Sequence, residues 1–118
     1  MADVVVTIPK AIWFDWIAEG DAVGEPASGE EWYYQVGQRP AILPGERVYV
    51  VAHGRLRGYA PLTRVVPWGS SWRLLRAGNA RAVTVPSPIQ GFQGWRYRWW
   101  DRAEERAFLD WQTAGVPP

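Results

Sequence analysis

The chain has no cysteine, one histidine and one lysine among its 118 residues. Without cysteine there are no disulfides and no thiolate chemistry, and the commonest zinc ligands are missing. His53 alone cannot form a typical metal site, so we expect neither a metal nor a cofactor. No apolar run approaches the about 18 residues of a membrane span, and the N-terminus lacks the basic and then apolar layout of a signal peptide. We therefore expect a soluble, cytoplasmic protein with no membrane partner.

Acidic residues are missing from the middle of the chain. Residues 47–100 contain no Asp or Glu, whereas an even distribution would place about five or six acids there. These 54 residues contain nine arginines, Arg47, Arg55, Arg57, Arg64, Arg73, Arg76, Arg81, Arg96 and Arg98. Residues 1–46 carry eight acids and two basic residues, so the net charge of +1 combines an acidic first third with a strongly basic middle. This division favours an anionic partner.

The pattern of apolar residues and turns predicts an α+β fold, mainly β, in one domain over residues 1–118. A strand over residues 3–8 precedes a helix over residues 10–19, in which apolar residues lie four apart and which ends at Gly20. A short C-terminal helix is expected from Asp101, as its N-cap, to about residue 111. Residues 113–118 are expected to fray.

Between the two helices the chain predicts strands over residues 32–36, 47–52, 55–66, 72–76, 80–85 and 95–100. The strand over residues 47–52 has apolar residues on both sides, so we expect it to be buried on both faces. Pro61 implies an edge or a bulge in the strand that contains it. Gly78 and Asn79 indicate a hairpin between residues 72–76 and 80–85.

Two arginine pairs, Arg55 with Arg57 and Arg96 with Arg98, have one residue between their members. Residues two apart on a strand share a face, with about 7 Å between their stems. Such a pair can bind neighbouring phosphates, because each planar guanidinium donates two parallel hydrogen bonds to an oxyanion. The other arginines of the acid-free stretch are expected to be scattered over the surface, Arg64, Arg73, Arg76 and Arg81 among them.

The densest run of aromatic and basic residues covers residues 95–100, WRYRWW. Strand alternation places Trp95, Tyr97 and Trp99 on one face. One interpretation puts these aromatics in the core and the arginines in water. The other keeps Trp95 or Trp99 at the mouth of a pocket, where a base can stack. Both interpretations leave Arg96 and Arg98 free to face a ligand.

Motifs for catalysis are weak. His53 ends a strand just before Gly54, and a lone histidine in such a place is more often structural than catalytic. The serines lie in loops without a nucleophile-elbow sequence, and no glycine-rich phosphate-binding motif occurs. Adjacent Glu30 and Glu31 would point in opposite directions on a strand. The sequence therefore favours a binding protein over an enzyme.

The order of these elements resembles the PUA-like superfamily, and within it the ASCH and EVE domains. The matching segments are residues 8–20, residues 44–50 (PGERVYV) and residues 57–60 (RGYA), so the resemblance covers the chain to about residue 66. It implies a small PUA-like β-barrel with an N-terminal helix and a cleft for RNA, single-stranded DNA or a modified nucleobase.

Some ASCH domains are amidohydrolases or nucleases and carry a G-x-K-T-x-E sequence after the first helix. The same spacing here falls on residues 20–25, GDAVGE. Ala22 stands in the lysine position and Val23 in the threonine position, and only Glu25 is retained. Without the amine and the hydroxyl the resemblance implies binding rather than turnover, and it leaves Glu25 and His53 as weak catalytic candidates.

We therefore expect a non-catalytic domain that binds RNA, single-stranded DNA or a modified nucleobase. The candidate ligand-binding residues are Trp32, His53, Arg55, Arg57, Tyr59, Trp95, Arg96 and Arg98. Two alternatives stay open. The protein could be a protein-interaction module, or form a homodimer, through the same aromatic and arginine surface. It could also be an ASCH-type amidohydrolase or nuclease. Acids from residues 1–46 and 101–105 could fold against the arginines and neutralise them.

Overall fold

The structure is a computed structural model, and it describes residues 3–8, 32–76 and 80–108. The described residues are mainly β, as the sequence predicts. The elements in chain order are β1 (Val4–Thr7), β2 (Trp32–Val36), β3 (Arg47–Ala52), β4 (Arg55–Trp68), β5 (Ser71–Arg76), β6 (Val83–Thr84), β7 (Trp95–Tyr97), the single 3-10 turn η1 (Arg102–Glu104) and β8 (Arg106–Ala107).

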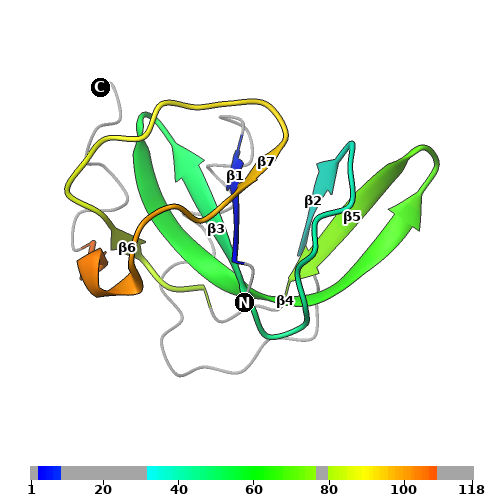
Figure 1. Ribbon diagram of the computed structural model, residues 1–118, viewed down its shortest axis with the longest axis horizontal. Coiled ribbons are helices and arrows are strands. Elements are labelled where there is room, and N and C mark those ends of the chain that lie inside the picture. The colour runs from blue at the N-terminus through cyan, green and yellow to red at the C-terminus, as the bar shows by residue number, and fades with distance from the viewer. Residues whose placement is uncertain (1–2, 9–31, 77–79, 109–118) are drawn as a thin grey trace.

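Six of the strands form one sheet in the order β2-β5-β4-β3-β1-β7, and β6 pairs with β8 in a separate ribbon. The long strand β4 curves along the base of the molecule in Figure 1 and joins the β5-β2 arm to the β3-β1-β7 side. In the described residues β2 and β7 remain edge strands, so the sheet is open. The expected closed barrel is therefore not formed by this part of the chain.

The middle of the sheet is buried on both faces, which confirms the prediction for residues 47–52. Val48 and Val50 belong to one core cluster, whereas Tyr49 and Val51 belong to a second cluster on the opposite side. Alternate residues of one strand thus enter different cores, as the side-chain period of two requires. The second cluster is covered by the chain around Val85, Ile89 and Trp100.

Two β-bulges interrupt β4. Leu56 pairs with Val51 and Gly58 with Val50, so Arg57 has no partner opposite it. Further along, Leu62 pairs with Arg76 and Arg64 with Leu75, which leaves Thr63 as the extra residue. Pro61 itself pairs with Arg47, so the irregularity expected at the proline lies two residues to the C-terminal side. Each extra residue changes which side chains of β4 face the core.

Three sequence predictions differ from the structure. The helix expected over residues 101–111 is wrong at its start, because the chain makes only one 3-10 turn before entering β8; Asp101 does cap that turn through a capping box. The expected hairpin between residues 72–76 and 80–85 is also wrong, because β5 pairs with β2 and β4. The last predicted strand is shorter and ends at Tyr97.

The predicted helix over residues 10–19 lies outside the described residues, as does the loop that contains Glu25. Within residues 3–8, 32–76 and 80–108 there is no helix with the length and apolar character needed to cross a membrane.

Candidate nucleic-acid interface

A groove with four arginines lies where β4 meets the β6-β8 ribbon. Its volume is about 390 Å³, and its described lining consists of Arg47, Tyr59, Arg81, Ala82, Val83, Arg102, Glu105, Arg106 and Ala107. Contacts between distant segments assemble it. Tyr59 and Arg81 exchange backbone hydrogen bonds of 3.0 and 2.8 Å, and Thr84 pairs with Arg106 in the ribbon. The groove therefore concentrates basic residues that are far apart in the sequence.

Glu105 holds one side of the groove in place. Its carboxylate accepts hydrogen bonds from the Tyr49 hydroxyl at 2.6 Å, from the indole of Trp100 at 2.9 Å and from Arg47 Nη1 at 3.1 Å. Burial, together with the hydrogen bond to this carboxylate, raises the pKa of Tyr49 well above its ordinary value. Tyr49 therefore stays protonated and keeps donating to Glu105.

Asp3 neutralises Arg102, which lines another part of the groove. Its fully buried carboxylate lies 2.8 Å from Arg102 Nη2 and 3.0 Å from Arg98 Nε. Burial alone would raise the pKa of Asp3. The hydrogen bonds from the Arg47 backbone amide, Arg102 and Arg98 outweigh burial and hold that pKa below its ordinary value. Arg102 is thus committed to an ion pair within the fold.

Arg81 and Arg106 are the arginines of the groove that remain available to a ligand. In the described part of the chain neither has a carboxylate within salt-bridge distance. The ring of Tyr59 lines the same groove, is half-buried and has the Arg47 guanidinium 4.1 Å from its centroid. An aromatic ring next to free guanidinium groups can contact a base while the arginines hold phosphate oxygens.

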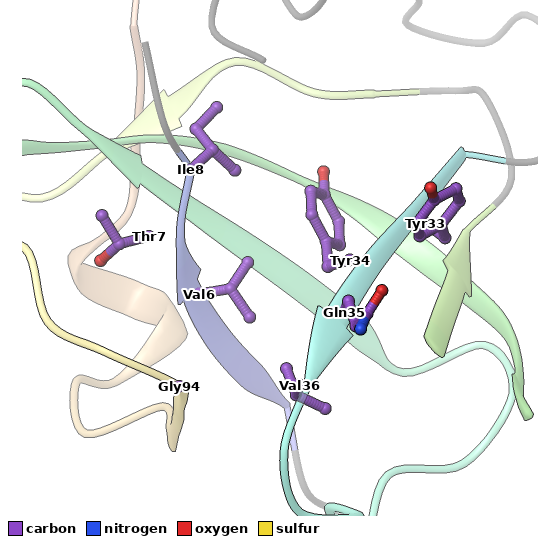
Figure 2. A pocket seen from close by; sticks show the side chains of 8 residues that line it. All are labelled: Val6, Thr7, Ile8, Tyr33, Tyr34, Gln35, Val36 and Gly94. Atoms are coloured by element: carbon purple, nitrogen blue, oxygen red, sulfur yellow. The ribbon is translucent and has the colours of Figure 1, made fainter. Parts of the chain in front are cut away.

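A second concavity lies between β1 and β2 and is shown in Figure 2. Val6 of β1 and Ile8, just after this strand, line one side, and Tyr34 and Val36 of β2 line the other; its volume is about 280 Å³. Its described lining contains no charged side chain. Among the described residues this cleft offers no group that could neutralise a phosphate, so the arginine groove is the better candidate for a nucleic-acid contact.

The pair Arg55 and Arg57 does not form the exposed phosphate clamp that the sequence predicts. Arg57 is 0% exposed, because the bulge at this residue turns it into the interior. Its Nε donates to the Ala52 carbonyl at 2.9 Å, and its guanidinium lies 5.3 Å from the ring of Phe108. Arg55 lies over the same ring at 5.6 Å. Burial, followed by repulsion from Arg55, lowers the pKa of Arg57 to about 10.

The second predicted pair is divided. Arg96 is exposed, with its guanidinium 4.4 Å from the ring of Phe92. Arg98 pairs with Asp3 and also donates to the Trp100 carbonyl, so Asp3 already neutralises its charge within the fold. Trp95 is half-buried against the first core cluster, and its indole donates to the Gln38 carbonyl at 2.9 Å. Trp95 therefore packs and hydrogen-bonds within the fold, whereas Arg96 is exposed.

The remaining predicted residues do not converge on one site. Tyr59 lines the arginine groove, but Trp95 packs against the other core cluster. His53 occupies the turn between β3 and β4 with φ of 51°, a left-handed conformation that is uncommon for a residue other than glycine. The side chain of Trp32 and all of Glu25 lie outside the described residues.

The predicted site contained none of the four groove arginines, Arg47, Arg81, Arg102 and Arg106. Two of them, Arg102 and Arg106, lie beyond the acid-free stretch, next to Glu104 and Glu105. Their position in the groove depends on the pairing of β6 with β8, which no local pattern indicates. Arg76, expected at the surface, is also buried.

The chain has no match among protein-family models, curated proteins or solved structures.

Proposed function

We propose that this protein binds single-stranded nucleic acid, RNA or DNA, through the arginine groove. The observation that carries this proposal is the position of Arg81 and Arg106, two arginines with no carboxylate partner among the described residues, beside the ring of Tyr59. Proteins that bind single strands combine cationic grooves with aromatic rings on which bases stack. The network around Glu105 supports this role because it fixes Arg47 over Tyr59 before any ligand arrives.

The groove favours a flexible strand over a rigid duplex. Its charged side chains come from three separate segments, β3, the Arg81 region and the η1-β8 segment, and they surround a small hollow instead of lying along one flat face. A single strand can turn a phosphate into such a hollow and place the adjacent base against Tyr59. The likeness to PUA-like domains, which covers roughly residues 3–66, agrees with this proposal and adds no residue to the groove beyond Arg47 and Tyr59.

Fluorescence anisotropy with labelled oligo(U) and oligo(dT) of about 12 nucleotides, in about 50 mM salt, tests the proposal. We expect binding in the micromolar range and about tenfold weaker binding for the Arg81→Ala/Arg106→Ala double variant, because each phosphate contact is lost with its guanidinium. Free nucleosides in the same assay distinguish an oligonucleotide partner from a nucleobase ligand.

Arg39→Ala is the matched control. Arg39 is an exposed arginine outside the groove, with its guanidinium 5.0 Å from the ring of Trp72. Its removal lowers the net charge by one, as Arg81→Ala alone does, so a nonspecific charge effect would weaken these two single variants equally. Absence of binding to either oligonucleotide at tens of micromolar protein would reject the proposed function.

A further inference from the structure

The outer face of the β2-β5-β4 arm carries a second arginine and aromatic cluster, separate from the groove. Residues that pair across strands share a face, so Gln35, Arg73 and Val66 lie side by side, and Tyr33, Leu75 and Arg64 form the next row. Trp68 follows Val66 by two residues on β4 and lies on the same face. No acidic side chain belongs to this face in the described strands.

Arg73 lies between two exposed aromatic rings. Its guanidinium carbon is 4.0 Å from the ring centroid of Tyr33 on β2 and 3.7 Å from that of Trp68 on β4. The rings come from opposite neighbours of β5 and remain 48% and 55% exposed. Both distances are within the range of favourable cation-π contact, so the rings hold the guanidinium in one place.

The hydrogen-bonding capacity of Arg73 is not used within the described residues. It has no ion pair there, and its Nε is buried without a hydrogen-bond partner. An arginine whose position is fixed by ring contacts and whose donors are unused loses little conformational freedom when it binds an oxyanion. The cluster is therefore preorganised for an anion with planar groups beside it.

We infer that Tyr33, Arg73 and Trp68 form a second subsite for single-stranded nucleic acid, in which Arg73 binds a phosphate and the two rings stack with the flanking bases. This inference rests on the proposed function and extends it to a second contact on the same strand of ligand. The arrangement repeats that of the groove, where Arg47 lies over Tyr59 beside two available arginines.

The chemistry of this face favours nucleic acid over an acidic protein segment. An acidic peptide would satisfy Arg73 but would leave the Tyr33 and Trp68 rings without a flat partner. A nucleotide supplies both a phosphate and a ring, and base stacking on aromatic side chains tolerates any sequence. The charge of Arg73, on a face with no acid in the described strands, is complementary to a phosphate backbone.

The groove and the second subsite contact the ligand at different positions along β4. Tyr59 and Trp68 are nine residues apart on β4, which is roughly 30 Å along an extended strand and less where β4 curves. An oligonucleotide of about 4 residues is too short to reach both contacts, and one of about 12 residues can span them. A ligand that reaches both gains affinity through the high effective concentration of its second end.

The experiment compares labelled oligo(dT) of about 4 and about 12 nucleotides on the full chain. For the wild type we expect at least about tenfold tighter binding of the longer oligonucleotide. Arg73→Ala and Trp68→Ala should remove most of this gain and leave the affinity for the short oligonucleotide within about twofold. Arg39→Ala, which also removes a guanidinium that lies over a tryptophan, should retain the gain.

The outcomes separate the subsite from the groove. If both Arg73→Ala and Trp68→Ala keep the full gain with length, the subsite is wrong and the groove proposal stands. If the wild type binds neither oligonucleotide, the proposed function fails first and the subsite with it. Tighter binding of an Asp- and Glu-rich peptide than of the longer oligonucleotide, lost on Arg73→Ala, would assign this face to a protein and overturn the inference.

Discussion

Asp3 and Arg98 form an ion pair of 3.0 Å that joins the start of β1, which Asp3 directly precedes, to the segment after the edge strand β7. The Asp3 carboxylate is fully buried and also accepts hydrogen bonds from Arg102 and from the backbone amide of Arg47. One acid near the N-terminus thus fixes three segments that are far apart in the sequence. It also removes Arg98 from the surface available to a ligand.

Replacement of Asp3 should therefore destabilise the fold. Asp3→Asn keeps the size of the side chain but leaves Arg98 and Arg102 without their counter-charge, and we expect a loss of about 3 kcal/mol in the free energy of unfolding. Urea unfolding followed by tryptophan fluorescence measures this loss. Arg102→Gln should cost less, because Arg102 is partly exposed and Asp3 keeps its bond to Arg98. Equal losses in the two variants would contradict this account.

The lowered pKa of Asp3 predicts a specific dependence on pH. In the unfolded chain Asp3 takes up a proton at a higher pH than in the fold, so the unfolded state binds more protons as the pH falls. The stability that Asp3 contributes is complete above its ordinary pKa and is lost as the pH falls through the lower folded value. The free energy of unfolding should decrease less between pH 5 and pH 3 in Asp3→Asn than in the wild type. Parallel curves would assign the acid sensitivity to other groups.

The fold could be predicted from the sequence where local pattern decides it. Residues 32–36 and 47–52 form β2 and β3 with the predicted limits, and the apolar residues on both sides of β3 enter two cores. The arginine pair at residues 55 and 57 could not be placed, because strand alternation assumes an uninterrupted strand. The bulge at Arg57 breaks that assumption and buries a guanidinium that alternation places beside Arg55.

The groove could not be predicted because it depends on pairings between distant segments. The bridge between Tyr59 and Arg81 and the ribbon of β6 and β8 bring together residues that are 22 or more apart in the sequence. The sequence predicts in general terms that acids of residues 1–46 and 101–105 could neutralise the arginines. Only the structure shows that Asp3 and Glu105 do so, at Arg98, Arg102 and Arg47.

Arg57 should contribute to stability and not to ligand binding. Arg57→Ala removes a large buried side chain and its hydrogen bond to the Ala52 carbonyl, so we expect a loss of about 2–4 kcal/mol in the free energy of unfolding. The affinity for oligonucleotides should stay within about twofold of the wild type, measured where the variant is fully folded. A large loss of affinity in a folded variant would place Arg57 in the binding site after all.

Glu105→Gln should show whether the charge of the groove or the fixed position of Arg47 has the larger effect on oligonucleotide binding. The substitution removes the acid that holds Arg47, Tyr49 and Trp100, and we expect a loss of about 1–3 kcal/mol in stability. The groove becomes more basic by one charge, so binding of oligo(dT) at low salt should strengthen by a few-fold despite the weaker fold. Weaker binding would show that the fixed position of Arg47 matters more than its charge.

The salt dependence of binding should report the number of phosphates held in the groove. For single strands the slope of log K against log salt changes by about 0.7 for each phosphate contact. The Arg81→Ala/Arg106→Ala variant should therefore show a slope smaller by about 1.4 than the wild type. A titration over several salt concentrations measures both slopes, with Arg39→Ala as the control. Unchanged slopes would mean that neither guanidinium contacts a phosphate.

Because of the bulge at Thr63, the side chains on the outer face of the arm depend on the number of residues in β4. Before the bulge Leu62 faces the first core, and after it Val65 does, so Arg64, Val66 and Trp68 point outward only because one extra residue intervenes. A substitution alters one side chain at a time. Deletion of this single residue would exchange the whole row of side chains between solvent and interior, so a codon-sized change in the gene can create or remove the surface that carries Trp68 in one step.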